Sequence, residues 1–316
     1  MNTCQAVLER LSDGRRHSGA GLAESLGITR AAVWKQIEAL RGLGLNISGA
    51  AGGGYQLDGP LRFLDAGRIR SAMPDCAPVL ETRFVVDSTN RELADLRAAG
   101  SDCQVLIAEG QRAGRGRRGR SWLSPPGRGI YCSVAWSFES GLTGLGALSL
   151  VTGLSAADCL AEAGLDSVRV KWPNDLVVDG AKLGGCLVEI GGSAEGPCRA
   201  IVGLGINVAI GPVDSLGQPV TDLQAQGLSV DRDRLAGALI QTLSRDLARL
   251  DADGFGSFSE RWRARDALAG RAVIIHSMSD PVHGRADGVD ATGRLWLDTG
   301  SERMTVSAGE VSVRAG

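Results

Sequence analysis

The chain has 316 residues, of which 43% are hydrophobic and 22% charged, and its formal net charge is −2. That length is large for one hydrophobic core, so two or three domains are expected. The near-neutral balance excludes a globally basic nucleic-acid coat but leaves room for local basic patches. The most apolar stretch, 142–165, is interrupted by Asp158 and Glu162, which predicts a core helix and no membrane span.

The seven cysteines form no C-x-x-C pair, their number is odd, and no secretory segment precedes them. This pattern predicts reduced thiols in a cytoplasmic protein. The three histidines are too few and too scattered for a zinc cluster. The first sixteen residues are polar and amphipathic, so no targeting peptide is expected.

The first sixty residues have the pattern of a small helical domain. Two helices at the start are followed by Gly27, and Thr29 then N-caps a helix whose buried face includes Val33 and Ile37. Two short helices joined by a tight glycine turn are typical of a helix-turn-helix. The glycine-rich stretch 45–57 predicts a hairpin wing beside it.

A recognition helix meets base edges and phosphates with the residues near its start. The residues predicted to bind DNA there are Thr29, Arg30, Ala31, Trp34 and Lys35. Residues 1–60 hold six Lys or Arg against five Asp or Glu, which is a weak electrostatic footprint. The alternative is a helix-turn-helix that serves as a protein interaction module. If the domain binds DNA, its low charge means that two copies on a two-fold operator are needed to gain affinity.

The segment Arg112–Arg120, named here the arginine loop, holds five arginines and three glycines and no acid. Glycines let backbone N–H groups approach a ligand, and guanidinium forks match phosphate and carboxylate oxygens. The loop is therefore predicted to close over a polyanionic ligand. Because its charges repel and nothing apolar holds it, we expect it to be mobile when empty. A solvated basic turn and a nucleic-acid tether are the alternatives.

The same loop matches G-x-G-x-x-G between Gly114 and Gly119. The dinucleotide fingerprint also needs a helix directly after the glycines and an acid roughly 20 residues on. Glu139 has about that spacing, but the segment 122–126 cannot open a helix. A nicotinamide or flavin site is therefore disfavoured.

Residues 81–268 alternate strand-like segments with a few helices, which predicts an α+β domain built on a mixed sheet. Ser88 and Thr89 precede a predicted helix over 91–99, where they either cap the helix or hold a small polar ligand.

Lys171, Asp175 and Lys182 stand beside apolar strand residues, where an unpaired charge is costly. One interpretation is a Lys–Asp pair that joins two strands. The excess of lysines and arginines in this part of the chain favours an anionic ligand instead, and nucleotide phosphates would supply it. Pro173 predicts that the strand pair around it bends or lies at a sheet edge.

Short strands divided by glycine turns follow to the C-terminus, which predicts a small β-barrel. The expected organisation is a helix-turn-helix domain over 1–62, a linker over 63–80, a central domain over 81–268 and the barrel over 269–316.

Three motifs together resemble the biotin–protein ligases. They are the segment Gly110–Trp122 that contains the arginine loop, the segment Lys171-Trp-Pro-Asn-Asp175, and Lys182-Leu-Gly-Gly185 followed by Glu189. With the helix-turn-helix, nearly the whole chain resembles the bifunctional biotin ligases and biotin operon repressors of bacteria. The resemblance implies α+β architecture, with a winged helix-turn-helix, a central mixed-sheet domain of the biotin/lipoate ligase type and an SH3-like β-barrel at the C-terminus.

The resemblance implies an enzyme that joins biotin and ATP, with Mg²⁺, into biotinyl-5′-AMP and pyrophosphate. Biotin then passes to a lysine of the biotin carboxyl carrier protein. It also implies repression at operator DNA by a homodimer that forms when biotinyl-AMP is bound. The metal would come with ATP and not from a site of protein ligands alone. The alternatives are a ligand-sensing repressor without ligase activity and a lipoate–protein ligase.

Site residues follow from the resemblance by position. The implied contacts to the biotin ureido ring and its surroundings are Ser88, Thr89, Asn90 and Gln111, and those of the closing loop are Arg115, Gly116 and Arg117. Asn207 and Arg314 match positions near the nucleotide, and Trp122 suits an apolar wall for biotin.

Lys182 resembles the lysine that holds the biotin carboxylate and then the acyl-phosphate oxygen, and Asp175 resembles the acid required in the site. Lys182, Arg117 and Asp175 are therefore the predicted catalytic residues. Both reactants are negative, so catalysis rests on positioning and charge neutralisation and needs no nucleophilic side chain. Gly110 stands where a larger side chain is common in the family, which implies a looser strand before the loop.

Overall fold

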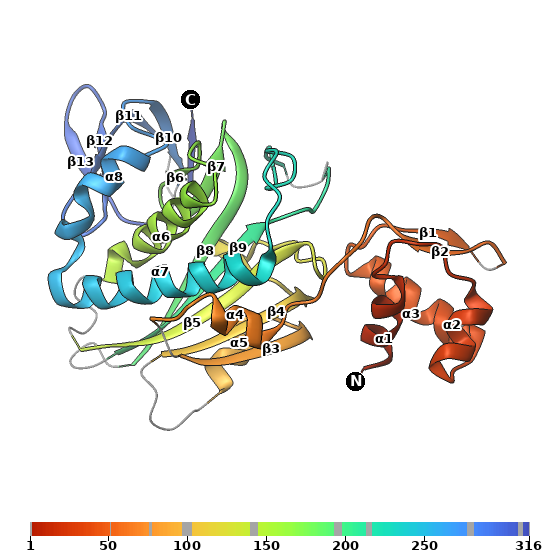
Figure 1. Ribbon diagram of the computed structural model, residues 1–316. Helices are drawn as coiled ribbons and strands as arrows, with labels where there is room; N and C mark the ends of the chain where they lie inside the picture. The colour runs from red at the N-terminus through yellow and green to blue at the C-terminus, as the bar shows by residue number, and fades with distance from the viewer. Residues whose placement is uncertain are drawn as a thin grey trace.

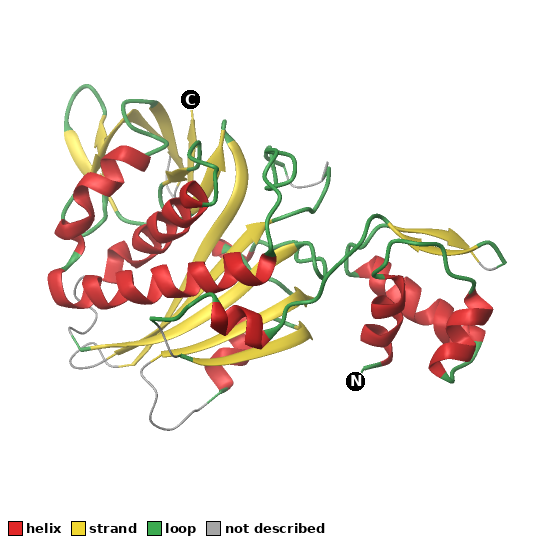
Figure 2. Cartoon of the chain, in the orientation of Figure 1, coloured by secondary structure: helices red, strands yellow, loops and turns green. Residues whose placement is uncertain are grey.

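The computed structural model describes residues 2–50, 52–75, 78–96, 103–139, 145–192, 198–212, 217–276, 281–308 and 312–315. A small helical unit at the N-terminus stands beside a larger body and is joined to it by a single extended stretch of chain (Figure 1). The larger body combines a long twisted sheet, helices packed over it and a second group of short strands near the C-terminus (Figure 2).

The N-terminal unit is a helix-turn-helix with a two-stranded wing, as predicted. Its elements are α1 (Thr3–Leu11), α2 (Gly19–Leu26), α3 (Arg30–Gly42), β1 (Ile47–Ala50) and β2 (Gly54–Leu57). Gly27 ends α2 with a φ of 64°, a left-handed conformation that glycine adopts without strain. Thr29 then caps α3, because its side chain accepts a hydrogen bond from the Ala32 amide at 3.1 Å. The antiparallel pairing of β1 and β2 confirms the wing.

The larger body begins with α4 and contains the main sheet. Its helices are α4 (Ala66–Ser71), α5 (Thr89–Asp95), α6 (Leu148–Glu162), α7 (Arg232–Asp253) and α8 (Ser259–Arg265). Single 3₁₀ turns occur at Arg117–Gly119, Leu145–Ala147 and Phe255–Phe258. The sheet strands are β3 (Val79–Val86), β4 (Cys103–Gln111), β5 (Gly129–Phe138), β6 (Arg169–Lys171), β7 (Asp175–Val178), β8 (Ala181–Gly192) and β9 (Cys198–Asn207).

The sheet is mixed, as predicted, with strand order β3-β4-β5-β9-β8-β7-β6. Only β3 and β4 run parallel among the described strand pairs of this sheet. The β6–β7 pair around Pro173 lies at one edge, which is where a residue without an N–H is tolerated. The register aligns five residues in one row across five strands: Tyr131, Gly205, Gly185, Asp175 and Lys171.

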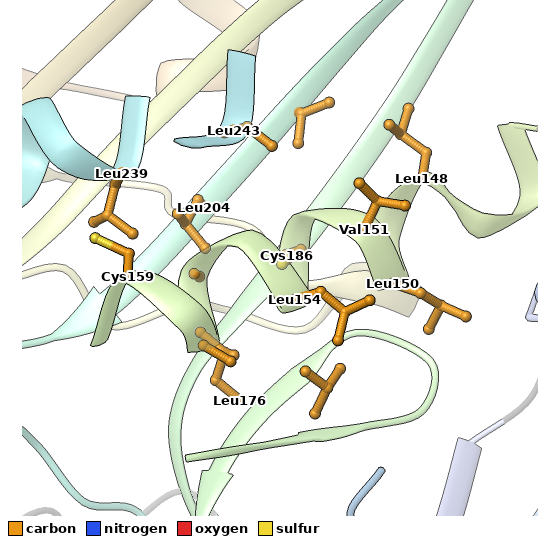
Figure 3. Packing of buried hydrophobic residues seen from close by; sticks show 14 of the residues in the cluster. Leu148, Leu150, Val151, Leu154, Cys159, Leu176, Cys186, Leu204, Leu239 and Leu243 are labelled. Atoms are coloured by element: carbon orange, nitrogen blue, oxygen red, sulfur yellow. The ribbon is translucent and has the colours of Figure 1, made fainter. Parts of the chain in front are cut away.

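One face of the sheet packs into the hydrophobic core, and the other carries the candidate site. Along β9, alternate residues such as Val202 and Leu204 point into the main hydrophobic core, which α6 and α7 cover. Figure 3 shows this packing, with Leu148 and Leu154 of α6 and Leu243 of α7 among the core side chains. The intervening residues of β9 lie on the opposite face, which α5 covers only in part. That second face carries the candidate site.

The C-terminal strands form a five-stranded antiparallel sheet with the order β13-β12-β11-β10-β14. They are β10 (Ala272–His276), β11 (Val282–Val289), β12 (Leu295–Asp298), β13 (Arg303–Val306) and β14 (Ser312–Ala315). Apolar residues of this sheet, such as Val273 and Leu297, share one buried cluster with the main domain. The predicted α+β architecture is confirmed. One boundary differs: α5 begins at Thr89 and ends at Asp95, and 97–99 of the predicted helix fall outside the described residues.

Two buried carboxylates hold the connection between the N-terminal unit and the sheet domain. Glu109 on β4 accepts a hydrogen bond from the Leu64 amide and pairs with Arg232 of α7 at 2.6 Å. Asp233 accepts from the Asp65 amide at 2.8 Å and pairs with Arg68 at 2.5 Å. Burial raises the pKa of Glu109. The connection is therefore fixed to the domain that carries the site.

Candidate active site and recognition helix

A cavity of about 780 Å³ opens on the second face of the sheet. Pockets for small molecules fall between about 300 and 1,000 Å³, so this volume is typical of a small-molecule site. Ten predicted ligand contacts line it: Ser88, Thr89, Asn90, Gln111, Arg115, Gly116, Arg117, Trp122, Lys182 and Asn207. Asp175 lines it as well. Residues that lie more than a hundred positions apart in sequence thus meet in one place.

The floor of the cavity is made of glycines. Gly203 and Gly205 alternate along β9 on the cavity face, and Gly185 lies beside Gly205 on β8. A Cβ at Gly203 would stand 2.4 Å from the Asn90 side-chain oxygen, and one at Gly205 would stand 2.7 Å from the Trp122 ring. At both positions the missing side chain lets Asn90 or Trp122 pack directly against β9 at the wall of the cavity.

The polar end of the cavity is a connected hydrogen-bond network. The Thr89 amide donates to Gln111 Oε1 at 2.9 Å, and Gln111 Nε2 donates to Ser124 Oγ at 2.8 Å. Ser133, fully buried on β5, lies 2.8 Å from Thr89 Oγ1 and donates to Asn90 Oδ1 at 2.6 Å. Ser88 occupies the N-cap position of α5 but makes no side-chain capping bond, so the capping role considered for it does not occur.

Lys182 and Asp175 form the charged centre of the cavity. Their Nζ and Oδ1 atoms are 2.6 Å apart, and their side chains are 16% and 21% exposed. The Lys182 ammonium also stands 5.3 Å from the centre of the Trp122 ring, within the range of a cation–π contact. The pair between strands considered from the sequence is therefore present, and it lines the cavity at the same time.

The arginine loop lines the cavity and has partners that the sequence did not reveal. Arg115 pairs with Glu189 of β8 at 2.9 Å. Arg117 lies 3.4 Å from Asn174 Oδ1 and donates to the Ala308 carbonyl of the C-terminal sheet region. Arg118 has a φ of 59°. The loop was expected to be mobile because its five arginines repel one another. Neighbouring acids and carbonyls offset part of that repulsion.

The strand before the loop is closely packed at Gly110. A Cβ there would stand 2.9 Å from the Pro126 Cγ and the Ser124 carbonyl. The looser strand inferred from the resemblance does not occur, because the chain that follows the loop fills the space a larger side chain would take.

The segment from Lys171 to Asp175 is anchored from three sides. Trp172 is buried and donates to the Gly293 carbonyl at 3.0 Å, and Ser149 of α6 donates to the Pro173 carbonyl at 2.9 Å. Asn174 Nδ2 donates to the Cys186 carbonyl at 2.8 Å. The Trp172–Pro173 peptide bond is cis. Burial, with the charge of Asp175 adding to it, raises the pKa of Cys186 to about 12, so this thiol is no nucleophile at neutral pH.

Some site residues were missed or remain undescribed. The lining residues that were not singled out include Asn174, Leu187, Gly203, Gly205 and the segment 217–220, whereas Arg118, Arg120 and Lys171 belong to the positive charge that the sequence assigned to an anionic ligand. Alternation along β9 could have placed Gly203 and Gly205 beside Asn207, whose amide donates to the Thr221 carbonyl at 3.0 Å. Arg314 belongs to β14, and its side chain lies outside the described part of the chain.

The described residues contain no group of three His, Cys, Asp or Glu that could hold a metal ion. Asp175 is the one carboxylate among the described residues that line the cavity. Mg²⁺ is commonly held by one or two carboxylates together with substrate phosphates. A lining with one carboxylate is therefore compatible with a Mg²⁺ that would enter with ATP, and Asp175 is the residue that would contact it.

The predicted DNA contacts lie together on the outer side of the N-terminal unit. Thr29, Arg30, Ala31, Trp34 and Lys35 are all exposed at the cap and first turns of α3. Trp34 is 53% exposed, which is unusual for a large apolar side chain. The opposite side of α3, with Val33 and Ile37, is fully buried. This orientation leaves the contact side of α3 accessible to a duplex.

Comparison with protein families gives three matches. The biotin/lipoate A/B protein ligase family matches residues 83–207, an HTH domain matches residues 4–56, and the biotin protein ligase C terminal domain matches residues 269–314. No described helix is long and apolar enough to cross a membrane.

Relatives and solved structures agree with these matches. The bifunctional ligase/repressor BirA of Salmonella typhimurium is 38% identical, covering 98% of this chain and 97% of its own. The protein of the same name from Escherichia coli is 36% identical, covering 98% and 96%. A biotin protein ligase from Aquifex aeolicus in complex with biotin and ATP superposes with a TM-score of 0.65 at 27% identity, covering 75% of this chain and 99% of its own.

Proposed function

The chain belongs to the biotin–protein ligases, among the bifunctional ligases and repressors, and we propose that it forms biotinyl-5′-AMP in the cavity described above and transfers biotin to the biotin carboxyl carrier protein. The observation that carries the proposal is the meeting of Arg115, Arg117 and Lys182 around one glycine-floored cavity. Such a cavity offers an apolar wall at Trp122 and a concentrated positive charge. A bicyclic acid and a nucleotide need those two properties side by side.

In the first step, the biotin carboxylate attacks the α-phosphorus of ATP in line, and the bond to the leaving pyrophosphate breaks. Repulsion between the two anions is the main obstacle, so fixed cations contribute most. We place the biotin ring beside Trp122, with the ureido group toward Thr89 and Gln111. Lys182 then neutralises the carboxylate, and Asp175 fixes the position of the ammonium through their 2.6 Å contact.

In the second step, the neutral amine of the acceptor lysine attacks the acyl carbon of biotinyl-AMP. An amide bond forms, AMP leaves, and the amine loses a proton. Lys182 is placed to offset the charge on the oxygens of the mixed anhydride. The arginine loop, with Arg115 and Arg117 over the mouth, shields that anhydride from water. When Mg²⁺ is bound with ATP it neutralises phosphate charge, and Asp175 is the carboxylate that could contact it.

The test is pyrophosphate release from ATP with biotin, lipoate or octanoate offered separately. We expect release with biotin and detection of biotinyl-AMP by mass spectrometry. Preference for lipoate or octanoate would indicate a lipoate ligase, and no release with any acid would indicate a sensing repressor without ligase activity. Arg234→Ala removes an exposed cation of α7 away from the cavity and is the matched control.

The second activity is repression. The exposed side of α3 supports operator binding by Arg30, Trp34 and Lys35, together with Thr29 and Ala31. We propose that biotinyl-AMP promotes a homodimer that binds a two-fold operator. Sedimentation with and without biotin plus ATP tests this, with a dimer expected only when both are present. A monomer under both conditions would contradict the mechanism.

We further propose the domain division 1–62, 63–80, 81–268 and 269–316. The N-terminal residues support the first boundary, since they form a buried cluster of their own.

We also propose that the protein is cytoplasmic. The six described cysteines are free thiols, which suits a reducing compartment, and Cys76 lies outside the described residues.

A further inference from the structure

A turn of the C-terminal sheet contacts the segment from Lys171 to Asp175, which carries residues into the cavity. Trp172 of that segment is 1% exposed, and its indole nitrogen donates to the Gly293 carbonyl at 3.0 Å. Gly293 belongs to the turn 290–294, which joins β11 to β12. The proposed chemistry gives this turn no task, although it bonds directly to a part of the cavity lining.

One carboxylate sets the shape of the turn. Oδ1 of Asp290 accepts hydrogen bonds from the Thr292 amide at 2.8 Å, the Thr292 hydroxyl at 2.7 Å and the Arg294 amide at 3.0 Å. Its Oδ2 accepts from Arg294 Nε at 2.7 Å. Gly293, with a φ of 81°, takes the left-handed conformation that glycine adopts without strain. The bonds to Asp290 therefore fix the direction of the Gly293 carbonyl.

The turn is also packed against the start of α6. A Cβ at Gly293 would stand 2.8 Å from the Cα of Ala147, the N-cap residue of α6. One turn further along, Ser149 donates to the Pro173 carbonyl at 2.9 Å. The segment thus has two neighbouring supports, the side chain of Ser149 at Pro173 and the turn at Trp172, and the two supports contact each other.

The residues after Trp172 connect this support to the charged centre of the cavity. Asn174 donates to a carbonyl of β8 at 2.8 Å, and Asp175 contacts Lys182 of the same strand at 2.6 Å. A shift of the segment would therefore move the carboxylate that orients the Lys182 ammonium. The other end of the cavity is supported differently, because Thr89 and Gln111 belong to α5 and β4 and bond to each other at 2.9 Å.

We propose that Asp290 is a positioning residue for adenylate formation. It shapes the turn, the Gly293 carbonyl then holds Trp172, and Trp172 fixes the place of the pair between Asp175 and Lys182. The inference rests on the proposed function, because that pair is the part that would meet the biotin carboxylate. Misplacement of a reacting group lowers the rate of the chemical step, whereas the ring of biotin keeps its contacts at the other end. The loss should therefore appear in kcat and not in the KM for biotin.

Kinetics of graded variants test the proposal. Asp290→Ala removes the acceptors of the turn and should lower kcat for biotinyl-AMP formation about tenfold, with the KM for biotin changed less than about twofold. Asp290→Asn keeps Oδ1 as an acceptor for Thr292 and Arg294 and should keep at least about half of the wild-type kcat. Asp287→Ala is the matched control, because it removes an exposed carboxylate of β11 that pairs with exposed Arg303, and it should behave as wild type.

The same contact can be broken from the side of the cavity. Trp172→Phe keeps an aromatic ring in the core but removes the N–H that bonds to the turn, so kcat should again fall about tenfold. The double variant with Asp290→Ala should be no slower than the slower single variant, because both changes act through one contact. Losses that multiply would overturn the proposal, and so would a wild-type kcat in Asp290→Ala.

Hydrogen exchange of the ligand-free protein gives a reading that needs no turnover. The Asn174 amide donates to the Lys171 carbonyl at 3.1 Å, and the Cys186 amide donates to the Asn174 carbonyl at 2.9 Å. Both amides should exchange about tenfold faster in Asp290→Ala and at the wild-type rate in Asp290→Asn, with α5 unchanged in both variants. Unchanged exchange at these two amides, or an equal increase in α5, would overturn the proposal. If the wild-type enzyme makes no biotinyl-AMP, the proposed function fails, and the exchange alone then supports or overturns the positioning.

Discussion

The cavity and the recognition helix use the same kinds of residues in opposite ways. In the cavity, Lys182 and Arg115 have carboxylate partners at 2.6 and 2.9 Å, and neighbouring amides and hydroxyls bond to one another. On α3, Arg30 and Lys35 are exposed to solvent on a helix that its cap, its buried side and hydrogen bonds from Arg41 to the wing hold in place. The polar groups of the cavity are therefore already paired with one another, whereas the exposed side of α3 is left open to a partner outside the chain. Substitutions should therefore couple strongly in the first region and weakly in the second.

The largest effect is expected at the centre of the cavity. Lys182→Ala should lower the rate of biotinyl-AMP formation by at least about 10²–10³-fold, because it removes the charge that meets the carboxylate and leaves Asp175 unpaired. Single-turnover formation of the adenylate measures it, with circular dichroism to show that the fold is kept. A rate within about tenfold of wild type would mean that the cavity is not built around this pair.

Packing of the cavity floor gives the next effect. Gly203→Ala should lower the free energy of unfolding by about 1–3 kcal/mol, because the new methyl meets Asn90 at 2.4 Å in a closely packed region. Gly191→Ala on β8 is the matched control, since a Cβ there meets nothing within 4 Å. Urea unfolding of the two variants gives the comparison. Equal stability would show that the floor adapts, contrary to a preformed cavity.

On the recognition helix, Arg30→Ala should weaken operator binding by about tenfold, the usual cost of a lost base or phosphate contact. Arg10→Ala removes an exposed charge from α1, outside the predicted contacts, and should change binding much less. Fluorescence anisotropy at fixed salt measures both. Equal losses would mean that general charge, and not the start of α3, determines affinity.

The smallest effect is at the helix cap. Thr29→Ala removes the bond to the Ala32 amide and should cost about 1 kcal/mol of local stability, whereas Thr29→Ser should keep it. Hydrogen exchange of the first amides of α3 reports the change. Unaltered protection in the alanine variant would show that the tertiary contacts of α3 hold its start without the cap.

Local patterns were enough to predict the helix-turn-helix, since Gly27, the Thr29 cap and the buried periodicity of α3 are contained in a few adjacent residues. The mixed sheet and the strand pair around Pro173 followed from alternation and breaks. The polar network could not be predicted, because Ser133 and Glu189 meet Asn90 only through the pairing of β5, β9 and β8 and the packing of α5 on that sheet. The partners of the arginine loop were missed for the same reason. The residues assigned through the family motifs do line one cavity, but apart from the resemblance nothing in the sequence indicated that they would be close together.

The most direct test of the central claim uses the intact enzyme with a biotin carboxyl carrier protein, biotin and ATP. Mass spectrometry of the acceptor should show one added biotinyl group on a single lysine, dependent on both substrates and absent with Lys182→Ala. An acceptor of unchanged mass with the wild-type enzyme, under conditions in which a known biotin ligase modifies it, would contradict the account.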